Sequence, residues 1–196
     1  MTTRLDDAGL DLIFREARSY NGYTDEPVTI AELHAIWDLA KMGPTSANMS
    51  PARIVWCVSV EAKDKLAALV SASNADKIRT APVTAIIGMD YDFHEKLPRL
   101  FPHVDARPWF VGNQPLIETS AFRNTTLQGA YLIIAARALG LDTGPMSGFD
   151  NDAVDAAFFA GTPVKSNFIT TLGHGDRGTI FGRSPRLDFA EANTII

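Results

Sequence analysis

Several motifs that identify common enzyme classes are missing from this chain of 196 residues. The sequence contains no GxSxG nucleophile elbow, no phosphate loop ending in GK[ST], no HExxH pair, and no GxGxxG segment placed between a predicted strand and a predicted helix. The sequence therefore gives no support for a serine hydrolase, a P-loop nucleotidase, a zinc protease or a Rossmann-type dehydrogenase.

Cysteine and histidine are also scarce. Cys57 is the only cysteine and stands within the apolar run RIVWCVSV, so the chain can form neither an internal disulfide nor a thiolate metal cluster. The histidines lack the spacing of metal ligands; they are His34, His94, His103 and His174. We therefore expect no metal site, a reducing cytoplasmic location, and a surface position on a helix for His34.

Excess basic charge and long apolar runs are lacking as well. The net charge is −5, whereas recognition of nucleic acids normally needs a basic surface. Charges or prolines interrupt every apolar run before it reaches the ~20 residues of a membrane helix, and the N-terminal MTTRLDDAGLDLIF does not resemble a signal peptide. With 46% hydrophobic and 21% charged residues, we expect a soluble globular protein without a nucleic-acid or membrane partner.

The pattern along the chain predicts helices and strands within one domain spanning residues 1–196. Thr29 and Glu32 form a capping box that predicts a helix start. The other helices are expected near 10–17, 63–70, 124–139 and 152–159, with Gly140 as a C-cap, and buried strands over 54–60, 83–89 and 168–172. The proline-rich segment 97–115 is expected to be a long structured loop of the kind that often forms lids, while 71–80 and 142–150 are expected to be polar connections.

Five polar segments carry the remaining chemistry. They are ARS at 17–19, GPTSAN at 43–48, SASNADK at 71–77, GPMSG at 144–148 and RSPR at 183–186. Taken one at a time, serine and asparagine in such segments usually serve turns and helix caps. Single arginines in such places are usually solvated surface charges.

Taken together and in this order, the segments resemble the nitroreductase family of FMN enzymes. The chain is similar over nearly its whole length to a subgroup of malonic semialdehyde reductases of pyrimidine degradation, through WDLAKMGPTSANMSPARIV, KIRTAPVTAI, LFPHVDAR, AFRNTTLQGAYLIIAARALGLDTGPMSGFD and RSPRLDF. The resemblance implies an α+β fold in three layers, with a mixed sheet flanked by helices. It also implies an interlocked homodimer in which each FMN lies in a cleft at the subunit interface.

The same resemblance assigns the cofactor contacts. It implies that two arginine-bearing elements hold the FMN phosphate and ribityl chain, Arg18 with Ser19 and Arg183 with Arg186, because guanidinium groups suit a dianion. Asn74 and Lys77 would address the polar edge of the flavin ring, where reduction places negative charge. The loop from the neighbouring subunit is Pro44, Thr45, Ser46 and Asn48, and the loop whose backbone N–H groups face flavin N5 is Pro145, Met146, Ser147 and Gly148.

One element departs from the family pattern. Many members have Arg-Arg-Ser or Arg-His-Ser at the first element, whereas this chain has Ala17-Arg18-Ser19. One basic phosphate contact is therefore missing, and the register of this element stays open.

The implied activity is hydride transfer from NADPH or NADH through FMN in a ping-pong cycle, without a catalytic side chain. The favoured substrate is malonic semialdehyde, reduced to 3-hydroxypropanoate, and Arg99 or Arg107 is the candidate contact for its carboxylate. An equal alternative is that both arginines are surface charges or pair with Asp105. Two other functions stay open: a broad nitroaromatic or quinone reductase of the same family, and a non-catalytic flavin-binding sensor or carrier.

Overall fold

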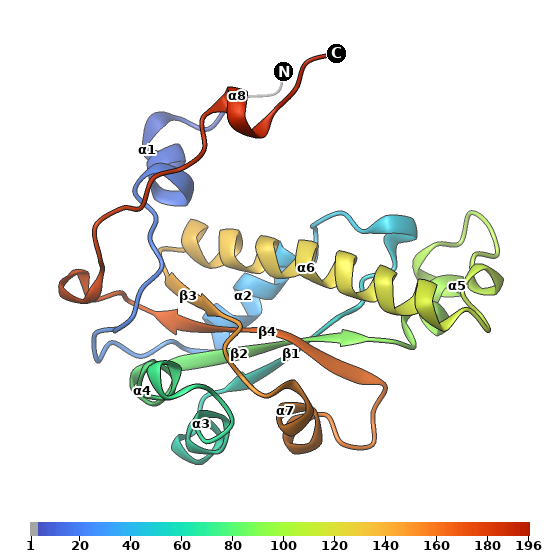
Figure 1. The fold of residues 1–196 in the computed structure, drawn as a ribbon, viewed down its shortest axis with the longest axis horizontal. Coiled ribbons are helices and arrows are strands. Elements are labelled where there is room, and N and C mark those ends of the chain that lie inside the picture. Colours follow the sequence, from blue (N-terminus) through green and yellow to red (C-terminus); the bar gives the residue numbers. More distant parts are fainter. Residues whose placement is uncertain (1–3) are drawn as a thin grey trace.

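The computed structural model describes residues 4–196 and contains a four-stranded sheet between two layers of helices (Figure 1). The strands are β1 (Ala52–Cys57), β2 (Val83–Asp90), β3 (Asp142–Met146) and β4 (Val164–Gly173). They lie in the order β1-β2-β4-β3, and each neighbouring pair is antiparallel. Parallel pairing within residues 4–196 is limited to an isolated bridge between Ser19 and Thr143. The resemblance implied a mixed sheet, and this bridge is the one parallel contribution to it among the described residues.

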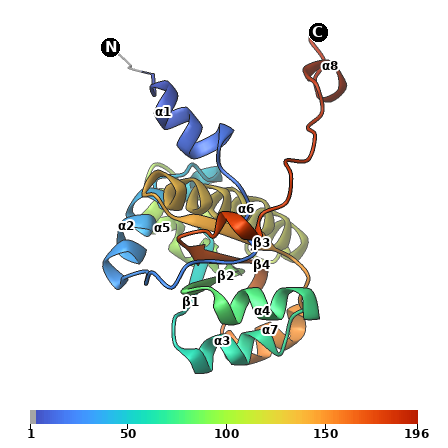
Figure 2. The same ribbon diagram turned by 90° about the vertical axis from the view of Figure 1, so that its left-hand side faces the viewer.

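Helices cover both faces of the sheet (Figure 2). One layer contains α2 (Ile30–Ala40) and α6 (Gln114–Ala138), and the other contains α3 (Val60–Ala67), α4 (Ala72–Thr80) and α7 (Asn151–Phe158). Side chains alternate across a strand, so Val83 and Ile87 of β2 pack with α2 and α6, while Ile86 packs with α3, α4 and α7. This three-layer arrangement confirms the predicted α+β class.

Shorter helices and the two terminal segments complete the chain. The short helices are α1 (Asp7–Leu10), α5 (Leu97–Leu100) and α8 (Phe189–Ala192), and a π-helical turn, Asp11–Arg15, follows α1. The segments that carry α1 and α8 project from the body on the same side (Figures 1 and 2). Within residues 4–196, no helix combines the length and the apolar character needed to cross a bilayer.

Several local predictions are confirmed. The Thr29–Glu32 capping box forms, with the Glu32 N–H donating to Thr29 Oγ1 at 3.2 Å and the Thr29 N–H donating to Glu32 Oε2 at 2.7 Å. Gly140 follows α6 with φ of 81°, the left-handed conformation of a C-cap glycine. His34 is exposed on α2. Cys57 is buried, and burial raises the pKa of its thiol to about 11.

Two segments predicted as polar connections form regular elements. Helix α4 occupies 72–80, and it escaped prediction because only Asn74 and Ile78 of it are buried, which leaves no apolar stripe. Strand β3 occupies 142–146 despite its glycine and its proline. Pro145 is tolerated there because β3 is an edge strand. Every second backbone N–H of an edge strand faces away from the sheet, so a proline at such a position loses no ladder hydrogen bond.

Some predicted boundaries were wrong. Helix α6 begins at Gln114 rather than at Asn124. Pro115 lies in its first turn, where backbone N–H groups form no hydrogen bond within the helix, so proline is compatible with the helix there. Strand β1 ends at Cys57 rather than at Val60. Val60 instead starts α3, which Ser59 caps by accepting the Ala62 N–H at 3.2 Å.

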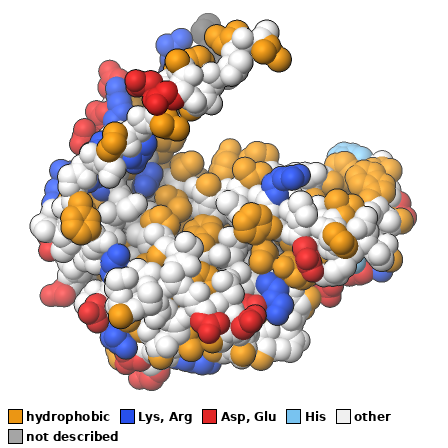
Figure 3. Space-filling view, in the orientation of Figure 1, with side chains coloured by type: hydrophobic (Ala, Val, Ile, Leu, Met, Phe, Trp, Pro, Cys, Tyr) orange, Lys and Arg blue, Asp and Glu red, His pale blue; other side chains and the backbone are white. Residues whose placement is uncertain are grey.

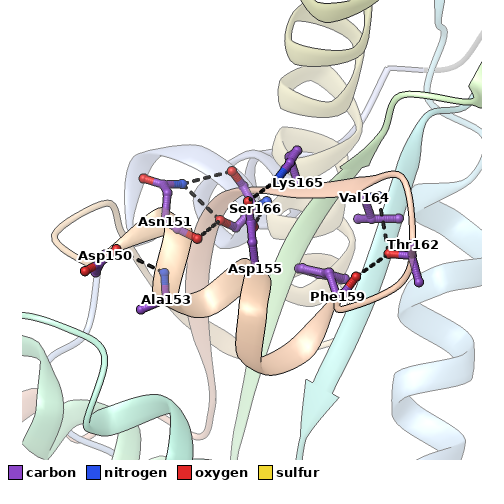
Figure 4. Close-up of polar contacts among 9 residues, drawn as sticks. All are labelled: Asp150, Asn151, Ala153, Asp155, Phe159, Thr162, Val164, Lys165 and Ser166. Carbon is purple, nitrogen blue, oxygen red and sulfur yellow. Dashed lines mark hydrogen bonds and ion pairs between the residues drawn. The ribbon is translucent and has the colours of Figure 1, made fainter.

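A polar cluster fixes α7 against β4 at an irregularity in the sheet. The register between β2 and β4 shifts between Ile87 and Gly88. Next to it, the buried Asp155 carboxylate accepts the Ser166 N–H at 2.7 Å, and Asn151 donates to the Ser166 carbonyl at 3.0 Å (Figure 4). The cluster supplies hydrogen-bond partners for the backbone N–H and carbonyl of Ser166.

Candidate functional site

The N-terminal segment 17–19 and the C-terminal segment 181–183 lie together beside β3. Ser19 forms a bridge with Thr143, and the adjacent Tyr20 N–H donates to the Thr143 carbonyl at 3.0 Å. Arg18 donates to the carbonyl of Phe181. Arg183 donates to the carbonyls of Arg15 and Ala17, at 2.6 and 3.2 Å. Two segments from opposite ends of the chain therefore meet at one edge of the sheet.

The charges of this region are not compensated by carboxylates. Within residues 4–196, the guanidinium groups of Arg18, Arg183 and Arg186 form hydrogen bonds only to carbonyl oxygens and no ion pair. Arg186 bonds within its own segment, to Ser184 and Pro185, and is not joined to 17–19. Arginine side chains without a carboxylate partner, as Arg18 and Arg183 are within residues 4–196, suit a multiply charged anion.

The start of α4 lies against the segment that follows β3. The Gly148 carbonyl accepts both the Ser71 N–H at 2.9 Å and the Asn74 side-chain amide at 3.2 Å. A Cβ atom at Gly148 would lie 3.0 Å from Asn74 Nδ2 and 3.1 Å from Ser71 Oγ, so glycine permits this close approach. Lys77 lies one helical turn beyond Asn74 and forms no ion pair within the described residues.

An apolar cavity of about 320 Å³ opens beside the segment 145–147. Its walls are Pro145, Met146, Ser147, Phe168 of β4, and Thr126, Ala130 and Ile133 of α6. Figure 3 shows a hollow between the terminal segments and the body of the molecule, with hydrophobic side chains inside it and Lys or Arg side chains along the terminal segments. Apolar walls with a few polar groups at the rim are typical of sites for flat organic cofactors.

The remaining predicted segment, 43–48, lies elsewhere. The Ser46 N–H donates to Asn124 Oδ1 at 2.8 Å, and the Asn48 side chain donates to the Leu100 carbonyl at 2.8 Å. These contacts place the segment towards the α5 end of α6, whereas β3 and the terminal segments lie at its other end (Figure 1). One chain therefore brings 17–19, 183, 71–77 and 145–148 together, but not 43–48.

The two arginines of the predicted lid differ in their surroundings. Arg107 binds Glu95 with two hydrogen bonds, at 2.8 and 2.7 Å, which raises the pKa of Arg107 and lowers the pKa of Glu95. Its partner is thus Glu95 and not Asp105. Arg99 is exposed on α5 and forms no ion pair within residues 4–196. Of these two arginines, Arg99 is the one whose guanidinium group has no ion pair among the described residues and is available to a new anion.

Sequence reasoning missed two buried amides on α6. Asn124 and Gln128 are each 3% exposed, and their side chains accept the backbone N–H groups of Ser46 and Ala52. Their signal was the i, i+4 spacing of amide residues within a predicted helix. The segment GHGDRG at 173–178 has the GxGxxG spacing, but it ends within a 3-10 turn, Arg177–Thr179, and does not open an α-helix, so it is not a dinucleotide motif.

Comparison with known proteins identifies the family. The family model described as "Nitroreductase family" matches residues 14–174. The chain belongs to the nitroreductase family. A protein of Burkholderia lata is 62% identical over 193 residues, which cover 98% of this chain and 99% of that protein. A protein of Stenotrophomonas maltophilia strain R551-3 is 58% identical over 195 residues, covering all of both chains.

Both relatives are provisionally named NADH dehydrogenase/NAD(P)H nitroreductase. Among solved structures, a provisionally named nitroreductase of Exiguobacterium sibiricum, in complex with FMN, matches with a TM-score of 0.85 at 20% identity and covers 100% of both chains. This structural likeness shows that the fold is the nitroreductase fold.

The contact between segment 17–19 and β3 yields a prediction at Gly144. A Cβ atom there would lie 2.5 Å from the Tyr20 carbonyl oxygen and 2.6 Å from Thr171 Oγ1. Because the backbone at Tyr20 must move to make room for this Cβ atom, we expect Gly144→Ala to lower the free energy of unfolding. The expected decrease in urea titrations is about 1–3 kcal/mol. Gly182→Ala is the control, since no atom lies within 4 Å of its Cβ position. Equal stabilities of the two variants would contradict the close packing.

Proposed function

We propose that this nitroreductase-family protein is an FMN-dependent NAD(P)H oxidoreductase that reduces a small electrophilic substrate. The observation that carries the proposal is the arrangement of groups along β3. Arginines that form no ion pair within residues 4–196 lie at one end, an apolar cavity lies beside the far end, and Asn74 lies at Gly148. This order matches a phosphate joined to a flat ring. The FMN bound in the structural neighbour and the NAD(P)H in the relatives' names support it.

The residues of this chain fit FMN by their chemistry. Arg18, Ser19, Arg183 and Arg186 would hold the phosphate. Asn74 and Lys77 would lie at the polar edge of the ring, where a cation favours the negative charge of the reduced state. The backbone of 145–148 would face the ring, because Gly148 allows close approach. When bound, FMN supplies the group that accepts and donates hydride, so no side chain need act as nucleophile.

Malonic semialdehyde is the substrate that we favour. The aldehyde, NAD(P)H and a proton give 3-hydroxypropanoate and NAD(P)⁺. The subgroup resemblance supports this choice, as does the difference between the lid arginines. Arg99 is available to a substrate carboxylate, whereas Arg107 already binds the carboxylate of Glu95. A role in pyrimidine degradation follows from the same resemblance.

A second candidate is a broad reductase of nitroaromatics or quinones. The names of the two relatives favour it, since both include nitroreductase. The mostly apolar cavity beside Met146 also favours it, because such walls select poorly among flat acceptors.

A homodimer is part of the proposal. Helix α6 buries Ala121, Leu132 and Ala136 against the body, but it also exposes an apolar stripe that includes Leu116, Leu127 and Tyr131, and it exposes the Phe122 ring on another side. The predicted face of α6, with Leu127 and Tyr131, is therefore the outer one. A helix that is apolar on both sides needs a second cover. Gly43 packs on the Tyr131 ring, so segment 43–48 borders the stripe, where it would meet 145–148 of a second copy.

The first test is of flavin binding and turnover. We expect the purified protein to bind FMN and its visible flavin absorbance to bleach anaerobically with NADPH or NADH. We also expect kcat/KM for malonic semialdehyde to exceed that for a nitroaromatic or a quinone by at least about tenfold, ~1.4 kcal/mol. The reverse preference would favour the broad reductase. FMN binding without bleaching by either nicotinamide would favour a sensor or carrier, and no FMN binding would contradict the whole proposal.

The phosphate contact is tested by comparing FMN with riboflavin, which lacks the phosphate. Because charge-assisted hydrogen bonds contribute ~1.5–3 kcal/mol, we expect Arg18→Ala and Arg183→Ala to raise the Kd for FMN roughly 10- to 100-fold. The Kd for riboflavin should stay the same. Arg79→Ala is the matched control, because Asp64 and Asp76 already pair with Arg79. A parallel loss for both flavins would place these arginines away from the phosphate.

The dimer is tested by light scattering. We expect a mass of twice the 21.3 kDa of the chain. The double variant Phe122→Asp/Leu127→Asp should be monomeric, because it places one charge in the apolar stripe and a second charge at the exposed Phe122 position of the same helix. Val60→Asp, an equally drastic change at a residue exposed on α3, should remain dimeric. A monomeric wild-type protein, or a dimeric double variant, would contradict this interface.

A further inference from the structure

The loop between α2 and β1 holds an unusual backbone conformation. Ala47, Asn48 and Ser50 have φ values of 47°, 48° and 41°, which lie in the left-handed region. Non-glycine residues disfavour this region because Cβ comes too close to the carbonyl oxygen, and only asparagine among these three adopts it with ease. Three such residues within four positions persist only where the surrounding structure holds them.

Two side chains of α6 hold this loop at both ends. Asn124 Oδ1 accepts the Ser46 N–H at 2.8 Å, just before the left-handed residues. Gln128 Oε1 accepts the Ala52 N–H at 2.9 Å, just after them and at the start of β1. The two amides lie one turn apart on the same face of α6, and both are buried. The strained residues are therefore enclosed between two fixed backbone groups.

The Asn124 amide is itself fixed. Its Nδ2 group donates to the Ser120 carbonyl at 2.9 Å, which directs Oδ1 towards Ser46. Within the loop, Thr45 Oγ1 accepts the Ser50 N–H at 3.1 Å. An apolar side chain at position 124 would remove the acceptor of the Ser46 N–H, and the loop would relax to a less strained conformation that gives this N–H to water.

We propose that Asn124 and Gln128 are positioning residues that hold loop 44–50 in the conformation needed to bind the cofactor. The inference rests on the proposed function and on its homodimer, in which Thr45, Ser46 and Asn48 would contact the FMN of the neighbouring subunit. The two amides act on FMN through the loop backbone. Strain in the loop makes this action necessary, because without the amides the binding conformation is only a minor one.

The test measures the loop without cofactor and with it. In the protein free of FMN, we expect Asn124→Ala to speed hydrogen exchange of the amides of 46–50 about tenfold or more, and to raise the Kd for FMN by a similar factor. The matched control is Asn113→Ala on the same helix, which removes a side-chain acceptor from the Leu116 N–H and does not touch the loop. It should leave both quantities unchanged even where it lowers the Tm.

A second substitution separates strain from general damage. Glycine adopts the left-handed region without penalty, so adding Ala47→Gly to Asn124→Ala should recover part of the affinity for FMN. Unchanged exchange at 46–50 in Asn124→Ala would overturn the inference, and so would a lack of recovery. Gln128→Ala, measured in the same way, replaces Asn124→Ala if the latter does not fold. If the wild-type protein binds no FMN, the proposed function fails, and hydrogen exchange alone still decides on the clamp.

Discussion

The pairing of β3 with β4 is the constraint on which the candidate site depends. It fixes the backbone of 142–146, and that backbone in turn gathers segments from the rest of the chain. Thr143 bridges Ser19 on the outer edge of β3, and the carbonyl of Gly148 beyond it accepts hydrogen bonds from the start of α4. Main-chain hydrogen bonds thus place the segment after Ser19 and the start of α4, whereas the Arg183 and Asn74 side chains donate hydrogen bonds to carbonyl groups themselves.

Helix α6 positions the residues at the other end of the candidate site. Its inner face packs on the sheet and also carries Asn124 and Gln128, which hold the loop before β1. Its outer face lines the cavity beside Met146 and carries the exposed apolar stripe. One rigid element thus sets the relative positions of the cavity, the strained loop and the surface proposed to meet a second copy.

The sequence predicted the elements whose patterns are local. The capping box at Thr29 and the apolar runs of β1, β2 and β4 depend only on residues that are close in sequence. Their patterns are therefore visible in the sequence alone. Helix α4 and strand β3 escaped because their conformations depend on tertiary contacts: α4 has almost no buried apolar face, and the partners of β3 are distant in sequence. The resemblance predicted the site segments, and the structure shows which of these segments meet within one chain.

Asn124 and Gln128 show why part of the site could not be read from sequence. A polar residue inside an apolar helix signals either exposure or a buried partner, and the sequence does not reveal which. Here the partners are backbone groups of a loop with left-handed residues. None of these residues is glycine, so the sequence does not indicate the left-handed conformation. Glycine would have removed the strain but also widened the range of conformations that the loop must give up on binding. Non-glycine residues held by two buried amides keep the range of loop conformations narrow. A narrow range favours a binding surface that is already formed before the ligand binds.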